Sequence, residues 1–314
     1  MTYLHLKRLF VALSLTAAFT ALLSASARRE EPPENVTPQV VVMRTVRTVP
    51  PQQTTRLLTG GTAYREGERG EMTLMGDSPY LKTVDAESLL IAPYDFTFEQ
   101  DGPAVLIVHT HTTEAYTPCD GWQYEPSGDY RTLDKSQSIV RVGAAIADQL
   151  AARGIEALHD TNVYDRPSFS QAYNTALPQI QKTLAEHPSV RIVLDVHRDA
   201  YAVGGEQQAY LTELDGEPSA QILLVVGDGG NYDYDGWRQN LKWNLKVYAA
   251  ANRAAPNLVR TLRLDHARYN QHLMPGSMLV EVGSAGNTLP QALCAARVFA
   301  DALADVIDGL KTGY

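Results

Sequence analysis

Cysteine is scarce in this chain. The 314 residues include 2 Cys, and Cys119 and Cys294 stand far apart, with neither in a CxxC or CxxH context. This spacing argues against a zinc finger, a dithiol redox pair and a disulfide-rich scaffold. The two thiols are either core residues or one disulfide, and the sequence leaves both alternatives open.

An excess of basic charge is also absent. Lys and Arg number 27 against 36 Asp and Glu, which gives a net charge of −9 and a pI of about 5.4. Nucleic-acid binding requires a clustered basic surface, so this balance argues against a nucleic-acid partner. The composition is otherwise that of a globular protein, with 44% hydrophobic and 20% charged residues, which excludes disordered and collagen-like classes.

The first 27 residues have the pattern of an export signal. Lys7 and Arg8 precede an uncharged stretch from Leu9 to Leu23, and Ala25-Ser26-Ala27 matches a small-residue cleavage site. We therefore expect the protein to be exported. The segment is either a cleaved signal peptide or an uncleaved membrane anchor, because residues 9–27 are just long enough to span a bilayer.

Residues 28–95 lack a sustained pattern. Residues 28–37 are charged and contain Pro, and Pro50-Pro51 and Gly60-Gly61 interrupt the remainder of the region. No helical or strand period is long enough for a second compact domain. We expect a linker or stalk that offers a surface to partner proteins.

Residues 96–314 alternate between short apolar runs and helical patterns, which predicts one α/β domain. Alternation of this kind predicts a mostly parallel sheet covered by helices on both faces, with its chemistry at the carboxyl ends of the strands. The expected strands are 104–108, 155–158, 190–196, 220–226 and 278–282, and the expected helices are 139–152, 173–187, 237–252 and 289–310.

Three of these strand ends carry residues suited to hydrolytic metal chemistry. His111 and Glu114 follow the first strand as an HxxE pair, and His197 follows an apolar run. Zinc binds imidazole nitrogen and carboxylate oxygen at about 2 Å, and a site with three protein ligands leaves a position for water. Glu281 lies alone in an apolar strand, where burial raises a carboxyl pKa toward that of a general base. The pattern predicts a zinc site of His111, Glu114 and His197 with Glu281 as the catalytic base.

Neighbouring residues have more than one interpretation. His109 is either a pocket residue that contacts substrate or the alternative ligand to His111. Asp195 either orients a ligand or accepts a structural N–H bond. Arg198 either stabilises a developing oxyanion as a catalytic residue or forms a structural pair with Asp199.

Several separated motifs, in this order, resemble the stage II sporulation protein P family. The resemblance covers roughly residues 96–312 and rests on Val108–Glu114, Arg131–Asp134, Asp195–Ala200, Arg268–Gln271 and Leu279–Gly283 with Asn287. Members of that family are exported, often membrane-anchored hydrolases that remodel peptidoglycan during engulfment of the forespore. They are related to zinc N-acetylmuramoyl-L-alanine amidases and also cut peptide cross-links.

The resemblance implies roles for individual residues. It supports His111 and His197 as zinc ligands and Glu281 as the catalytic carboxylate. Asp134 competes with Glu114 as the acidic ligand, because the wider amidases take theirs from a following helix whereas zinc carboxypeptidases of similar αβα architecture use HxxE. Asn270, Gln271 and Asn287 are expected to contact substrate.

The implied activity is hydrolysis of the amide between the muramic acid lactyl group and L-alanine of peptidoglycan, on the cell-wall side of the membrane. A zinc peptidase acting on stem peptides or cross-links shares the same chemistry and remains the alternative. A non-catalytic wall-binding scaffold is a further alternative. Residues 28–95 carry none of the family's motifs, and contacts with other wall-remodelling or membrane-complex proteins are expected there.

Overall fold

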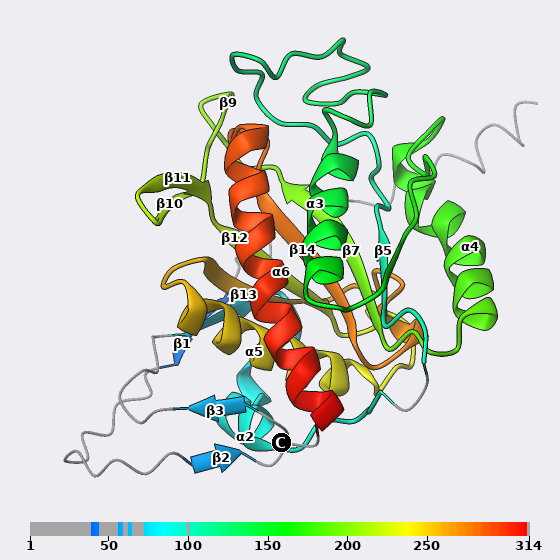
Figure 1. The fold of residues 1–314 in the computed structure, drawn as a ribbon, viewed down its shortest axis with the longest axis vertical. Helices are drawn as coiled ribbons and strands as arrows, with labels where there is room; N and C mark the ends of the chain where they lie inside the picture. Colours follow the sequence, from blue (N-terminus) through cyan, green and yellow to red (C-terminus); the bar gives the residue numbers. More distant parts are fainter. Residues whose placement is uncertain (1–38, 44–55, 59–61, 65–71, 99–100, 313–314) are drawn as a thin grey trace, which may run out of the picture. The chain divides into compact units, whose positions relative to one another are not determined.

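An eight-stranded sheet forms the centre of the protein (Figure 1). The computed structural model describes residues 39–43, 56–58, 62–64, 72–98 and 101–312. In sheet order the strands are β1 (Gln39–Met43), β4 (Met72–Gly76), β13 (Val259–Asp265), β12 (Ile222–Gly227), β14 (Ser277–Ser284), β7 (Ile192–Asp199), β5 (Val105–Val108) and β6 (Ala157–His159).

The sheet consists of two sets of strands that run in opposite directions. Strands β14, β7, β5 and β6 are mutually parallel, and so are β4, β13 and β12, but β12 pairs antiparallel with β14. The carboxyl ends of β5, β7 and β14 therefore meet at one edge, and this edge carries the candidate site. The sheet is mostly parallel, as the sequence predicts.

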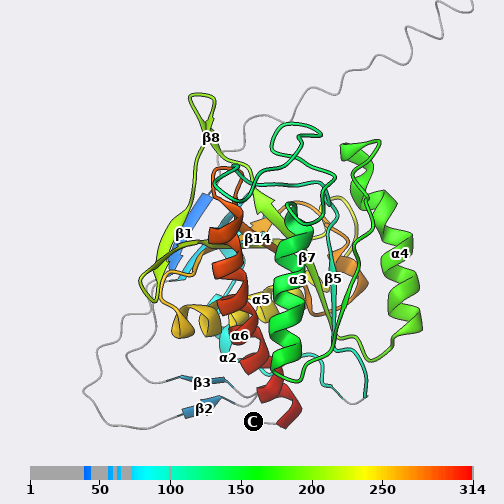
Figure 2. The same cartoon turned by 45° about the horizontal axis from the view of Figure 1, so that its top comes forward.

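Helices cover both faces of this sheet, which confirms the predicted fold class (Figures 1 and 2). Alternating side chains of β5 show the division: Val105 and Ile107 lie in the larger core, whereas Leu106 and Val108 lie in a second core. Helices α3 (Ile139–Ala152), α5 (Trp237–Ala254) and α6 (Leu289–Thr312) pack on the first face, and α4 (Ala172–Glu186) packs on the second.

The region before residue 96 contributes to the same folded body. Strand β4 pairs parallel with β13 and buries Leu74, and helix α2 (Ala86–Ile91) buries Leu90. Lys246 of α5 donates from Nζ to the carbonyl oxygen of Leu90 at 2.6 Å. These contacts correct the expected stalk over residues 28–95, since residues 39–43 and 72–92 supply two strands of the sheet and part of its helical cover.

Short hairpins and turns complete the described chain. The paired short strands are β2 (Arg56–Leu58) with β3 (Thr62–Tyr64), β8 (Ala202–Val203) with β9 (Glu206–Gln207), and β10 (Leu211–Leu214) with β11 (Glu217–Ala220). Single 3-10 turns are η1 (Leu81–Thr83), η2 (Phe169–Gln171) and η3 (Gln271–Leu273).

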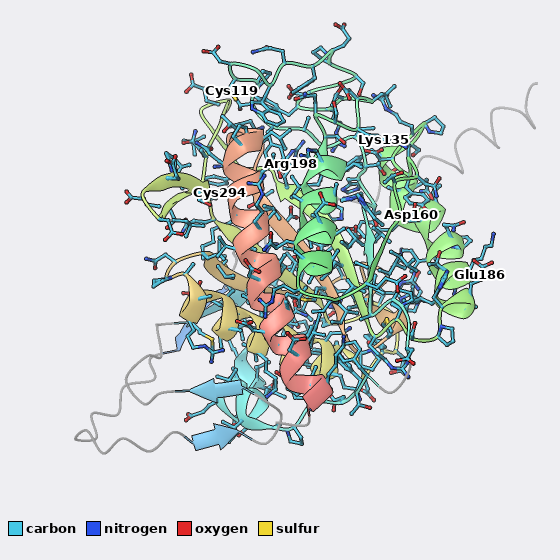
Figure 3. The ribbon with its side chains drawn as sticks, in the orientation of Figure 1. Cys119, Lys135, Asp160, Glu186, Arg198 and Cys294 are labelled. Carbon is cyan, nitrogen blue, oxygen red and sulfur yellow. The ribbon has the colours of Figure 1, made fainter. Side chains whose placement is uncertain are left out.

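Two sequence expectations concern the cysteines and the N-terminal segment. Cys119, on the loop before α3, and Cys294, on α6, are both free thiols (Figure 3). The predicted export segment, residues 1–27, lies outside the described residues. Among the helices that the structure describes, none is both long and apolar enough to span a bilayer.

Candidate metal centre

The carboxyl ends of β5, β7 and β14 bring three sequence motifs together. The HxxE motif follows β5 directly, and a turn closed by the Glu114 amide donating to the His111 carbonyl at 3.1 Å places both side chains on one side. His197 lies in β7, next to Glu281 in the neighbouring strand β14. Parallel pairing of β5, β7 and β14 thus gathers the groups that the sequence assigned to one site.

His111, Glu114 and His197 form a cluster that can hold a metal ion. One ligand atom from each lies within 4.8 Å of the others. The Nδ1 atom of His197 is 3.3 Å from Oε2 of Glu114, and Nδ1 of His111 is 3.6 Å from Oε1. Two imidazoles and one carboxylate match the ligand types of a catalytic metal with one position left for water.

Asp134, the competing acidic residue, lies outside this cluster. Its carboxylate is exposed and accepts hydrogen bonds from the backbone amide and hydroxyl of Ser136 at 2.9 and 2.7 Å. These bonds lower the pKa of Asp134. The geometry therefore favours Glu114 as the acidic ligand.

Glu114 is held in its ionised form within the cluster. Burial raises the pKa of Glu114, but Arg198 and the two imidazoles outweigh it and hold that pKa well below its usual range. Glu114 is 4% exposed and thus carries a buried negative charge. A buried carboxylate next to two imidazole nitrogens is stabilised by a bound cation.

Glu281 lies beside the cluster with an unused oxygen. Its Oε2 atom is buried and has no hydrogen-bond partner among the residues that the structure describes. Burial raises the pKa of Glu281 to about 8, the positive charge of His197 opposes this rise, and the charges of Glu114 and Asp199 add to it. Since buried polar atoms are normally paired, the free Oε2 indicates an atom poised for water or substrate.

Asp195 lies against the ring of His197 on the side opposite Glu114. Its Oδ1 lies 2.8 Å from Nε2 of His197 and also accepts the backbone amide of Thr110 at 2.9 Å. Burial lowers the pKa of His197, but Asp195 and Glu114 raise it well above its ordinary value. Of the two expected interpretations of Asp195, the contact with His197 supports the one in which Asp195 orients a ligand.

Arg198 supports Glu114 from within the protein. Its Nε donates to the carbonyl oxygen of Ala115 and its NH2 to that of Tyr130, both at 3.0 Å, and its NH1 lies 3.8 Å from Glu114 Oε1. The backbone amide of Arg198 donates to Glu114 Oε2 at 3.2 Å. The residue is 5% exposed, so we correct the expected catalytic role to a positioning role.

The expected pair of Arg198 with Asp199 is also corrected. Asp199 pairs instead with Arg260, whose NH2 lies 2.5 Å from Oδ2. The guanidinium of Arg260 also stacks on the ring of Tyr210, 3.7 Å from the ring centroid.

His109 points away from the cluster into the α3 face. It is fully buried, with Nδ1 2.9 Å from the carbonyl oxygen of Val196 and Nε2 2.9 Å from Nε2 of His159. Gly143 of α3 allows this packing, because a Cβ there would lie 2.4 Å from His109 Nε2. Burial lowers the pKa of His109 to about 3. We correct its expected substrate contact to a structural role.

Gln271 and Asn287, also expected to contact substrate, use their side-chain amides for hydrogen bonds within the protein. Gln271 accepts the Gly227 amide at Oε1 and donates from Nε2 to the Val225 carbonyl, each at 2.8 Å. Asn287 accepts the Ser284 amide at 2.9 Å and donates to the Tyr210 carbonyl at 3.1 Å. Both are buried, so their roles are corrected to bracing the sheet and its loops.

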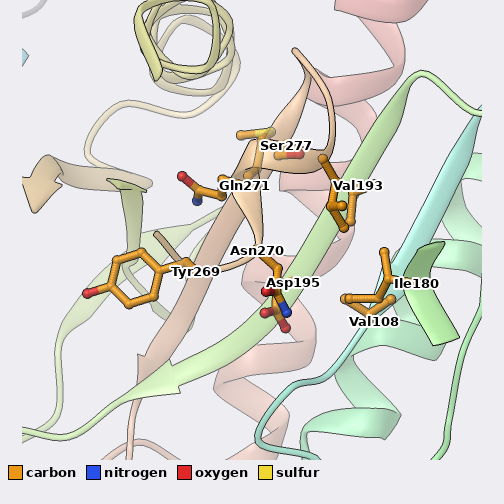
Figure 4. Close-up of a pocket in the computed structure, with 10 residues that line it drawn as sticks. Val108, Ile180, Val193, Asp195, Tyr269, Asn270, Gln271 and Ser277 are labelled. Carbon is orange, nitrogen blue, oxygen red and sulfur yellow. The ribbon is translucent and has the colours of Figure 1, made fainter. Parts of the chain in front are cut away.

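Asn270 bonds the backbone at the start of α4. It adopts a left-handed conformation with φ 55° and donates from Nδ2 to the carbonyl oxygen of Tyr173 at 2.8 Å. It lines a small cavity with Asp195 and Val108 on the α4 side of the sheet (Figure 4). It therefore contacts the backbone at the start of α4, and its expected contact with substrate stays a prediction.

Three residues beside the cluster were missed as site residues from the sequence. Phe169 is 51% exposed and stacks on His111 with ring centroids 4.0 Å apart. The guanidinium of Arg131 lies 4.5 Å from the Phe169 ring centroid, and its NH2 lies 3.7 Å from Glu114 Oε1. The Tyr173 ring is edge-on to His111 at 5.6 Å. Phe169 lies in the turn η2 just before α4, and Tyr173 lies in the first turn of α4. No pattern of apolar residues in the sequence identifies either one as a site residue.

Comparison with known proteins identifies the family. The family model described as stage II sporulation protein P matches residues 26–304. The chain belongs to the stage II sporulation protein P family. A curated relative, stage II sporulation protein P of Bacillus subtilis (strain 168), is 24% identical over 217 residues, which is 66% of this chain and 51% of that relative. This member of the family therefore spans about half the length of the curated relative it matches.

Solved structures similar to this family member carry amidase names. The N-acetylmuramoyl-L-alanine amidase AmiC2 of Nostoc punctiforme is 15% identical, with a TM-score of 0.35 over 66% of this chain and 97% of that one. The CwlD amidase from Clostridioides difficile, solved in complex with the GerS lipoprotein, is 13% identical, with a TM-score of 0.38 over 67% of this chain and 98% of that one.

Proposed function

We propose that this protein is a zinc-dependent peptidoglycan hydrolase that cleaves the amide between the lactyl group of N-acetylmuramic acid and L-alanine, in wall remodelling during spore formation. The observation that carries the proposal is the cluster of His111, Glu114 and His197 beside the unpaired Oε2 of Glu281. Membership of the stage II sporulation protein P family supports the setting in sporulation.

The donor set favours zinc. Two imidazoles and a carboxylate with a separate carboxylate nearby are the groups of a hydrolytic zinc site. Zinc held by His111, Glu114 and His197 would supply a Lewis acid that polarises the substrate carbonyl and lowers the pKa of water. Asp195 orients His197, and Arg198 holds Glu114 in its buried position.

Glu281 performs the proton transfers in this proposal. Its ionised carboxylate accepts a proton from the attacking water and then delivers it to the amide nitrogen as the carbon–nitrogen bond breaks. The products are a lactyl carboxylate and a peptide with a free L-alanine amine. The oxygen of water ends on the lactyl carbon and its first proton on the leaving nitrogen; the second proton, lost as the lactyl carboxylate forms, is taken up by the L-alanine amine, so atoms and charge balance.

We further propose that residues 1–27 direct export and that the enzyme works on the wall side of the membrane. Its uncharged stretch and small-residue cleavage site support this placement. Fractionation of cells and N-terminal sequencing of the extracellular form test it. A protein retained in the cytosol with an intact N-terminus would contradict it.

Mass spectrometry of digested peptidoglycan tests the bond specificity. The amidase releases free lactyl ends and intact stem peptides, whereas a peptidase shortens stems or opens cross-links and leaves the lactyl amide intact. Glu281→Gln serves as the control for contaminating activity. Shortened stems without free lactyl ends would show a peptidase and contradict the amidase. If neither wild type nor Glu281→Gln gives any product, the result would favour a wall-binding scaffold.

A further inference from the structure

Tyr173, in the first turn of α4, lies beside the candidate metal centre. Its ring is nearly parallel to that of His197, with an interplanar angle of 18° and centroids 6.4 Å apart. It meets the ring of His111 edge-on, at 75° and 5.6 Å. Tyr173 therefore borders both imidazoles of the cluster.

The hydroxyl of Tyr173 has no hydrogen-bond partner among the described residues. Neighbouring tyrosines differ in this respect. Tyr269, whose ring centroid lies 5.6 Å from that of Tyr173, donates to Asp265 Oδ2 at 3.1 Å, and Tyr116 donates to the Val282 carbonyl at 2.8 Å. This hydroxyl is not among the fully buried side-chain atoms that lack a partner, so it keeps accessible surface and is available to water or to a bound molecule.

The backbone at Tyr173 is held in place by Asn270. The Asn270 side chain donates to the Tyr173 carbonyl at 2.8 Å from a residue that is only 6% exposed. Asn tolerates the left-handed backbone conformation found here, which most residues avoid. This contact fixes the start of α4 relative to the sheet, and it gives Asn270 a positioning function.

Two guanidinium groups near the cluster are held by hydrogen bonds within the fold. Arg198 donates to the carbonyls of Ala115 and Tyr130. Arg131 donates from NH1 to Asp165 at 2.9 Å and to Thr113 at 3.2 Å. The hydroxyl of Tyr173 is, by contrast, a neutral donor on a ring that borders both imidazoles.

We propose that Tyr173 is a catalytic residue whose hydroxyl donates a hydrogen bond to the carbonyl oxygen of the scissile amide. The bond strengthens as negative charge develops on that oxygen during attack by water, and no covalent bond to Tyr173 forms. This inference rests on the proposed amide hydrolysis, and it assigns to Tyr173 the oxyanion contact that the sequence suggested for Arg198.

Tyr173→Phe isolates the hydroxyl, because it keeps the ring over the imidazoles. Loss of one oxyanion donor lowers kcat by about 100- to 1000-fold. We expect kcat for a soluble muramoyl-peptide to fall in that range, with KM within about threefold of wild type and metal content and Tm unchanged. Tyr269→Phe is the matched control, since its hydroxyl is bonded to Asp265, and its kcat should stay within about threefold.

A binding measurement provides a second readout. A phosphinate analogue of the amide carries a charged tetrahedral oxygen, and calorimetry should show it binding at least about tenfold more weakly to Tyr173→Phe than to wild type. Wild-type kcat and wild-type analogue affinity in Tyr173→Phe would overturn the inference while leaving the hydrolase intact. If wild type and Glu281→Gln cleave the amide equally, or neither cleaves it, the proposed function fails first and the inference falls with it.

Discussion

Oδ1 of Asp195 lies 2.8 Å from Nε2 of His197, while Nδ1 of the same ring lies 3.3 Å from Glu114 Oε2. The imidazole thus lies between two buried carboxylates, and its Nδ1 atom is on the side of the proposed metal ligand Glu114. Carboxylates in this position orient a histidine ligand and increase its basicity. In the proposed metal site, the affinity for the metal would therefore depend on a residue that is not itself a ligand.

Asp195→Ala should therefore weaken zinc binding without removing a ligand. Loss of such an orienting partner typically costs about 10- to 100-fold in affinity. Competition with a fluorescent chelator measures the change. Asp134→Asn is the control, because Asp134 is exposed and bonded to Ser136, and it should bind zinc as wild type does. A larger loss in the Asp134 variant would exchange the roles of Asp134 and Glu114.

Glu281→Gln should retain zinc and lose turnover. The amide keeps the size of the carboxylate but cannot accept the proton from water, and removing a general base costs about 100- to 10,000-fold. Elemental analysis and single-turnover assays of the same preparation separate the two effects. Loss of the metal in this variant would make Glu281 a ligand rather than the base.

Arg198→Met should destabilise the metal-free protein strongly. It leaves the charge of Glu114 buried without its main counter-charge, and breaking a buried pair typically costs about 3–5 kcal/mol. Arg153→Met is the matched control, since Arg153 pairs with Asp301, Asp305 and Asp308 at the surface, where loss costs about 0–1 kcal/mol. Urea unfolding measures the free energy of unfolding of both variants. Equal losses in the two variants would reject the positioning role of Arg198.

The stability of the metal-free protein should depend on the ionisation of Glu281. Burial raises its pKa to about 8 in the folded protein, against about 4.3 for an unperturbed Glu in an unfolded chain. Between these values the folded state binds more protons, so its stability falls as pH rises from about 5 to 8. The difference in Tm between wild type and Glu281→Gln, measured across this pH range, should show this fall. A difference that does not change with pH would contradict it.

Much of the fold could be predicted from apolar periodicity. The helix predicted at 139–152 matches α3, and the strands predicted at 104–108 and 220–226 match β5 and β12 to within two residues. Strand β13 was missed because Arg260 and Arg263 interrupt its apolar run. The reversal between β12 and β14 was missed because strand direction depends on pairing across the sheet, which periodicity does not encode.

The candidate site was predicted less completely than the fold. The sequence identifies His111, His197 and Glu281 because they lie at or near the ends of apolar strands. A polar group buried there is costly unless it has a partner, which indicates a functional site. The roles of Arg198 and Asn287 were misassigned because their partners are backbone carbonyls and amides, which sequence motifs do not show. Tyr173 was missed because only the folded chain brings the start of α4 over His197.

Anomalous diffraction at the zinc edge, from crystals of the metal-loaded protein, tests the central claim most directly. The account predicts one peak within about 2 Å of an imidazole nitrogen of His111, an imidazole nitrogen of His197 and a carboxylate oxygen of Glu114, with Glu281 next to it but not bound. A peak bound by Asp134 in place of Glu114, a peak bound by Glu281, or no peak at these residues would contradict it.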